Sequence, residues 1–99
     1  MIKKRCSATL VGDGVVCPTP SYYWGFVCIT GGTNRTLAFY DNAMAASGTV
    51  IEKFVADANK TVDGHEHHTP VDCDNGIYAN IAGAGESVIV YYWPKGVSV

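Results

Sequence analysis

The amino-acid sequence predicts an all-β fold, an antiparallel β-sandwich or jelly-roll-like barrel of seven to eight short strands. The first supporting observation is that apolar runs recur about every ten residues between Leu37 and Tyr92, which is the strand spacing of such folds. The second is that Gly and Asn punctuate these runs, as in Asn75-Gly76. The third is that no segment carries the periodicity of a long helix. We expect residues 1–99 to form one domain with a two-layer core.

Four strands are predicted in the first half of the chain. They cover residues 3–11 (with Cys6, Ala8 and Leu10 on one face), 15–17, 22–30 and 36–41. Pro18 and Pro20 end the second strand, because proline cannot donate to a β-ladder. The third strand is the densest run of β-forming residues in the chain, so we expect it to lie in the centre of a sheet.

The second half of the chain predicts four more strands and the two longest connections. The strands cover residues 49–56, 71–74, 77–82 and 87–93, and Pro94 ends the last of them. The segment Asn42 to Ala46 is too short to stand as a helix alone, and we expect it to form one turn of 3₁₀ or α geometry at a sheet corner. The segment Ala58 to His68 is the most polar stretch, which predicts a long loop.

The charge pattern limits the classes of partner. The formal net charge is −2 and the one basic cluster is Lys3-Lys4-Arg5, whereas nucleic-acid binding requires many clustered Lys and Arg to neutralise phosphates. No segment approaches the ~20 apolar residues of a membrane span. The apolar run after Arg5 is interrupted at Gly12-Asp13-Gly14, with no small-residue cleavage site, so we expect the protein to be used without export. We therefore expect neither nucleic acid nor a membrane as a partner.

Low charge and doubly apolar strands predict that part of the surface is covered. Charged residues make up 16% of the chain, against about 25% in typical domains. The run Val88 to Tyr92 is apolar on both faces, and burying both faces in a two-layer sandwich requires a partner subunit. We therefore expect a homo-oligomer, such as a trimer or another ring. The alternative is a small neutral domain rich in Ser, Thr, Asn and Gly.

Two matching aromatic triplets stand out, Tyr22-Tyr23-Trp24 and Tyr91-Tyr92-Trp93. Side chains alternate along a strand, so about half of each triplet should lie in the core. Aromatic rings with a polar group favour interfaces and sugar-binding surfaces. We expect the outward-facing rings to stack on a neighbouring subunit, with a glycan as the alternative.

The four cysteines are Cys6, Cys17, Cys28 and Cys73. No Cys-x-x-Cys pair occurs among them, which excludes the usual zinc and thioredoxin spacings. For a protein used without export we expect buried free thiols that act as small apolar groups. Two disulfides would be the arrangement expected in a secreted small protein.

One segment resembles a chemical site, the histidine cluster Gly64-His65-Glu66-His67-His68. Histidines at alternate positions share one strand face and could bind a transition metal, with Asp63 or Asp72 adding an oxygen ligand. The alternatives are a solvated loop that binds nothing specific and a pH-responsive contact. We expect the solvated loop and no cofactor. The weak metal candidates are His65, His67 and His68.

A nucleophilic thiol requires a histidine beside it, and Cys73 with His68 is the pair closest in sequence. No Gly-x-Ser-x-Gly, Cys-x-x-Cys or paired-carboxylate motif accompanies this pair. We therefore predict that the protein is not an enzyme and has no catalytic residue.

The order of turn and core motifs resembles the small structural proteins of tailed bacteriophages. The motifs are Leu37-Ala38-Phe39-Tyr40-Asp41-Asn42, Ala46-Ser47-Gly48-Thr49-Val50-Ile51, Asn75-Gly76-Ile77-Tyr78 and Val88-Ile89-Val90-Tyr91-Tyr92-Trp93-Pro94. The resemblance spans Thr36 to Pro94. It includes neither the histidine cluster nor the cysteines, and it carries over no functional residue.

This resemblance implies a non-enzymatic virion protein that self-associates and binds the capsid surface as a cement or decoration protein. Its partners would be copies of itself and the major capsid protein or other virion proteins. Its location would be the virion, after assembly in the host bacterial cytoplasm, where thiols stay reduced. The alternative functions are a tail or head-fibre component and a carbohydrate- or receptor-binding module that uses exposed Tyr and Trp.

Overall fold

The computed structural model describes residues 6–63, 71–83 and 85–96, without the side chains of Cys6, Asp63, Gly85 and Glu86. Nine β-strands and no helix occur in these ranges. The strands are β1 (Cys6–Leu10), β2 (Gly14–Cys17), β3 (Ser21–Thr30), β4 (Arg35–Tyr40), β5 (Val50–Ala56), β6 (Thr61–Asp63), β7 (Val71–Cys73), β8 (Ile77–Ala82) and β9 (Gly85–Pro94). The all-β prediction is confirmed, with one more short strand than the seven to eight expected.

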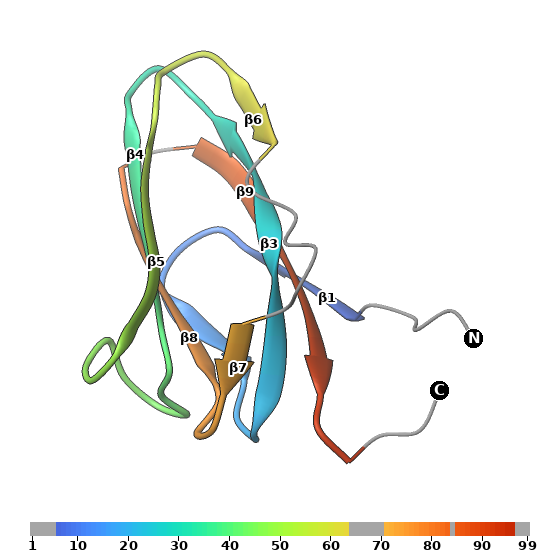
Figure 1. The fold of residues 1–99 in the computed structure, drawn as a ribbon. Helices are drawn as coiled ribbons and strands as arrows, with labels where there is room; N and C mark the ends of the chain where they lie inside the picture. The colour runs from blue at the N-terminus through green and yellow to red at the C-terminus, as the bar shows by residue number, and fades with distance from the viewer. Residues whose placement is uncertain (1–5, 64–70, 84, 97–99) are drawn as a thin grey trace.

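The strands form two antiparallel sheets, which Figure 1 shows as two layers facing one another. Sheet A has the order β1-β9-β3-β6, with β7 also paired to β3, and sheet B has the order β2-β8-β4-β5. The pairing is nested: β1 joins β9, β2 joins β8, β3 joins β6 and β7, and β4 joins β5. Nested pairing across two facing sheets is the arrangement of a jelly roll. The prediction that β3 lies in the centre of a sheet is confirmed.

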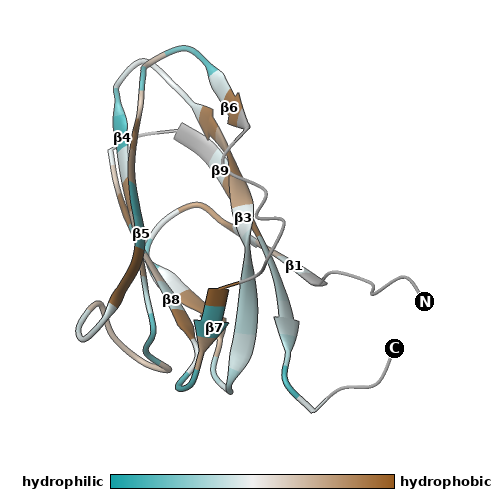
Figure 2. Ribbon diagram, in the orientation of Figure 1, coloured by the Kyte–Doolittle hydropathy of each residue, from teal (hydrophilic) through white to brown (hydrophobic). Residues whose placement is uncertain are grey.

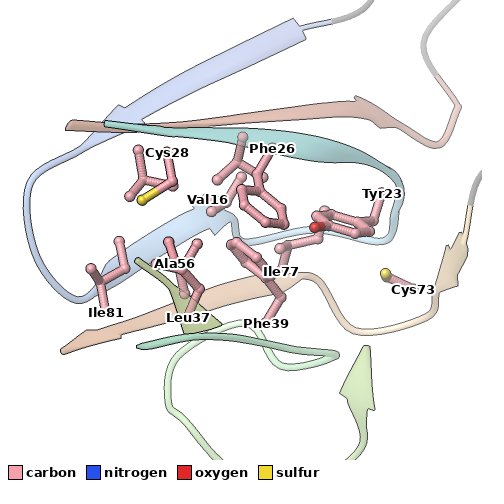
Figure 3. Packing of buried hydrophobic residues seen from close by; sticks show 13 residues of the cluster. Val16, Tyr23, Phe26, Cys28, Leu37, Phe39, Ala56, Cys73, Ile77 and Ile81 are labelled. Carbon is pink, nitrogen blue, oxygen red and sulfur yellow. The ribbon is translucent and has the colours of Figure 1, made fainter. Parts of the chain in front are cut away.

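The core lies between the two sheets, as Figure 3 shows for its labelled side chains. Alternation along the strands determines which side chains lie in the core. On β3, Phe26 and Cys28 are buried in it, whereas the alternate residues Val27 and Ile29 face the other side of sheet A. The Phe39 ring of sheet B packs against Tyr23 and Phe26 of sheet A, with ring centroids 5.2 Å and 5.5 Å apart. Aromatic contacts across the core therefore hold the sheets together.

One polar contact also crosses the core. The Tyr23 hydroxyl of sheet A donates a hydrogen bond of 2.6 Å to Glu52 Oε1 of sheet B. Burial, together with this carboxylate, raises the pKa of Tyr23. The Tyr23 side chain therefore stays neutral and keeps its proton available to Glu52.

The predicted long loop between Ala58 and His68 is wrong in part, because β6 lies inside it. Strand β6 pairs with the second half of β3, where Val62 is opposite Cys28. Strand β7 pairs with the first half, where Asp72 is opposite Tyr22. A three-residue strand at a sheet edge is held by backbone hydrogen bonds to its neighbour, so it needs no apolar run that the sequence would reveal.

The predicted helical turn at Asn42 to Ala46 is also wrong, because the segment forms a series of bends. The Asn42 side chain gives the reason. Its Oδ1 accepts hydrogen bonds from the backbone N–H of Met44 at 2.8 Å and of Ala45 at 2.9 Å. These amides are satisfied locally by a side chain, as in an Asx turn, and no helix follows.

Candidate interaction surfaces

The predicted metal candidates His65, His67 and His68 lie outside the described residues, as does the side chain of Asp63. The remaining candidate ligand, Asp72, is exposed and forms an ion pair with Lys95. Within the described part of the chain, no three His, Cys, Asp or Glu side chains are grouped to hold a metal ion. Metal binding at the histidine cluster therefore stays a prediction.

Lys95 binds the two carboxylates that flank Cys73. Its Nζ contacts Asp72 and lies 3.2 Å from Asp74 Oδ1, and it stands 5.3 Å from the centroid of the Tyr22 ring. Hydrogen bonding to Asp72 is the main reason that the pKa of Lys95 rises to about 12. The end of β9 is thereby tied to the β7–β8 turn, so Asp72 and Asp74 have a structural role.

Asp41 fixes the same turn from sheet B. Its carboxylate accepts hydrogen bonds from the backbone N–H of Asn75 at 2.8 Å and of Asp74 at 3.2 Å. Gly76 follows with φ +143°, and a Cβ there would lie 2.5 Å from the carbonyl oxygen of Cys17. Glycine is therefore required, because any side chain would collide with backbone.

Three cysteines have described side chains, and Cys17, Cys28 and Cys73 are all buried and free. This confirms the prediction of free thiols for these three, while the side chain of Cys6 lies outside the description. Burial is the main cause that raises the pKa of Cys73 to about 12, with Asp41 contributing. A thiol with this pKa is almost entirely protonated near neutral pH, so the Cys73 side chain is a neutral buried group.

The aromatic triplets divide between the two faces of sheet A. Tyr23 is in the core, and Tyr92, its partner in register, packs against it. Tyr22 and Trp93 are opposite one another and face the other side of sheet A, where Tyr22 is half-buried and Trp93 is only 6% exposed. These four aromatic residues therefore alternate between the two faces of sheet A, as expected. A register shift between Tyr23 and Gly25 interrupts the pairing of β3 with β9 locally.

The outer face of sheet B carries a row of apolar and aromatic side chains that crosses all four strands. Val15 pairs with Tyr78, Tyr78 pairs with Tyr40, and Tyr40 pairs with Val50. We call these four residues the tyrosine row. The end valines are exposed, Val15 by 41% and Val50 by 44%, and both rings are half-buried. In Figure 2 the first part of β5, which holds Val50, is brown.

The neighbouring row on this face ends in opposite charges. Asn80 pairs with Ala38, and Ala38 pairs with Lys53 at the β5 edge. At the β2 edge, the Asp13 carboxylate accepts hydrogen bonds from Asn80 Nδ2 at 3.3 Å and from the Ile81 N–H at 2.6 Å. We call this set the charged row. It places a carboxylate at one edge of sheet B and an ammonium group at the other.

Neither row was predicted from the sequence. Alternation along each strand identifies Tyr40 and Tyr78 as facing away from the core, because their neighbours Phe39, Ile77 and Ala79 are apolar and buried. The alignment of the rows depends on the register between strands that are distant in sequence. That register becomes visible only in the fold.

A buried cation closes one end of the sandwich. Arg35, at the start of β4, is 1% exposed, and its Nη2 donates a hydrogen bond of 2.6 Å to the carbonyl oxygen of Val11. Among the residues that the structure describes, its Nε and Nη1 atoms have no hydrogen-bond partner. Arg35 also lies near the buried Cys28 thiol, where its charge opposes the rise in pKa that burial causes. This side chain links the β1–β2 connection to sheet B.

Protein-family models, curated proteins and solved structures contain no match to this chain. The resemblance to phage structural proteins therefore stays a prediction from the sequence motifs between Thr36 and Pro94. Across the ranges that the structure describes, no helix is long and apolar enough to cross a bilayer.

Proposed function

We propose that this chain is a non-enzymatic structural protein of a bacteriophage virion, which self-associates and binds the capsid surface as a cement or decoration protein. Its partners are further copies of the chain and the major capsid protein or another virion protein. It is assembled in the host bacterial cytoplasm and resides in the virion. The free thiols Cys17, Cys28 and Cys73 are compatible with a reducing compartment.

The observation that carries the self-association in this proposal is the tyrosine row on the outer face of sheet B. It presents apolar and aromatic groups on a rigid sheet, over an area rather than in a cleft. Contacts spread over an area, with aromatic anchors near the centre, are typical of protein–protein interfaces. The jelly-roll strand order adds an analogy, because viral capsid domains use this architecture.

The analogy alone does not decide between functions, since lectin domains and cupins share the jelly roll. The half-buried rings of Tyr40 and Tyr78 favour one second candidate, a carbohydrate- or receptor-binding module. A tail or head-fibre component would use the same face. These candidates differ in where the protein sits on the particle and in whether it binds glycans.

Immunogold electron microscopy tests the proposal directly. An antibody raised against the recombinant chain is applied to purified particles from the genome that encodes it, with pre-immune serum as the control. We expect label over the capsid. Label confined to the tail or fibres would support the fibre alternative, and particles without label or without the chain by mass spectrometry would overturn the proposal. Glycan-array binding that is lost on Tyr40→Ala would support the receptor-binding alternative.

A further inference from the structure

The tyrosine row is self-complementary. Its order across sheet B is Val15, Tyr78, Tyr40, Val50, so it is apolar-aromatic-aromatic-apolar from either edge. Consider a two-fold axis that lies in the plane of contact, parallel to the strands and between β8 and β4. Rotation about this axis places β2 of one copy over β5 of another. Val15 then faces Val50 of the second copy, and Tyr78 faces its Tyr40.

The charged row favours the same two-fold axis, parallel to the strands. Asp13 lies at the β2 edge and Lys53 at the β5 edge, and both are exposed. The rotation brings Asp13 of each copy towards Lys53 of the other, so two opposite-charge contacts form. A two-fold axis perpendicular to the strands would instead superpose β5 on β5 and bring the two Lys53 residues to the same edge. Opposite charges across an interface fix its orientation, and like charges disfavour it.

We infer that the outer face of sheet B is a two-fold interface on which a second copy of this chain packs. An isologous contact requires one patch to be complementary to itself, and both rows on this face meet that requirement. Another protein as the occupant would explain neither the symmetric order of the tyrosine row nor the opposite charges at the two edges. This inference rests on the proposed function in one respect, since both require self-association. The sequence led us to expect a trimer or another ring, whereas this inference gives a two-fold dimer.

The size of the face sets the strength of the contact. Four strands about 4.8 Å apart, with about five residues each at ~3.3 Å, give a flat area of roughly 300–400 Å² per copy. Stable interfaces bury about 800 Å² per partner. At this size the pair belongs with weak, transient contacts, so we expect a dissociation constant on the order of 100 μM. A weak pair contact suits a protein that is concentrated on a larger surface.

Sedimentation velocity over about 5–500 μM, with variants, tests the inference. Val50→Glu places a carboxylate at the end of the tyrosine row, against Val15 of the second copy, and should abolish the dimer. Lys53→Glu places a carboxylate against Asp13 of the second copy and should raise the dissociation constant at least tenfold. The matched controls are Val11→Glu and Lys60→Glu, which make the same chemical changes at exposed positions off this face. Both controls should dimerise like the wild type.

The outcomes separate the inference from the proposed function. Circular dichroism melts establish that each variant is folded, and both Val50 and Lys53 are exposed enough to accept the changes. An oligomer that persists unchanged in Val50→Glu and Lys53→Glu would overturn the two-fold interface and leave self-association standing. A wild-type chain that stays monomeric across the whole range would overturn both. Loss of the dimer in the two variants and not in the controls would support the inference.

Discussion

Phe39 and Tyr78 give a direct test of which face of sheet B is the core. They lie on the neighbouring strands β4 and β8. Phe39 pairs with Ala79, and Tyr78 directly precedes Ala79, so Phe39 and Tyr78 face opposite sides of the sheet. Phe39 is fully buried and packs against the rings of Tyr23 and Phe26. Removing a buried Phe side chain costs about 3–5 kcal/mol, from lost transfer energy and the cavity left behind. We therefore expect Phe39→Ala to lower the free energy of unfolding by about 4 kcal/mol.

Tyr78→Ala is the matched control. Its ring is half-buried on the outer face, where losing a cross-strand pair costs about 1 kcal/mol or less. Urea unfolding followed by tryptophan fluorescence measures both values. A domain of this size has about 5–15 kcal/mol in total, so Phe39→Ala should be strongly destabilised or unfolded while Tyr78→Ala keeps most of its stability. Equal losses, or a larger loss for Tyr78→Ala, would refute the assignment of the faces.

Three further predictions concern the core and its titrating groups. Val90→Asp should unfold the domain, because it buries an unpaired charge, and circular dichroism would detect this; a native spectrum would contradict the burial of Val90. Tyr23→Phe removes the hydrogen bond to Glu52 and should cost about 1.5–3 kcal/mol in urea unfolding, and a loss below 0.5 kcal/mol, roughly the error of the method, would contradict that role. Stability should fall from about pH 9 towards pH 12, because the Cys73 thiol stays protonated in the folded protein while it ionises in the unfolded chain. Lys95 adds to this fall, because it loses its stabilising charge as the pH rises through its raised pKa. A flat profile of melting temperature over this range would contradict both.

The strands could be predicted from the sequence wherever burial imposes a period of two. In β3 the alternation of Phe26 and Cys28 with Val27 and Ile29 fixes both the element and its inward face. The short strand β6 could not be predicted, because Val62 is its one apolar residue and its pairing to β3 is made by backbone groups. Local periodicity carries no information about such a pairing.

The bends after β4 and the rows on sheet B illustrate two other limits. The Asn42 side chain accepts hydrogen bonds from the backbone N–H groups of Met44 and Ala45, so these groups are satisfied without a helical turn. The tyrosine row depends on the register that places Tyr40 beside Tyr78, residues on strands that meet only in the folded sheet. Register is set by the whole buried face, so a surface row that follows from it appears only with the fold.

Asp41, Asp72 and Cys73 have structural roles in this fold. Asp41 holds a turn through backbone N–H groups, Asp72 holds Lys95, and Cys73 is buried and protonated, so these groups stabilise the fold. The end valines of the tyrosine row, Val15 and Val50, stay in water unless another surface covers them. A face of this size binds weakly in a single encounter. When copies are held side by side on a larger particle, the effective concentration of each neighbour reaches the millimolar range, well above a dissociation constant of about 100 μM. In the proposed function, the same weak contact would then be occupied most of the time, whereas the dilute protein would be mostly monomeric.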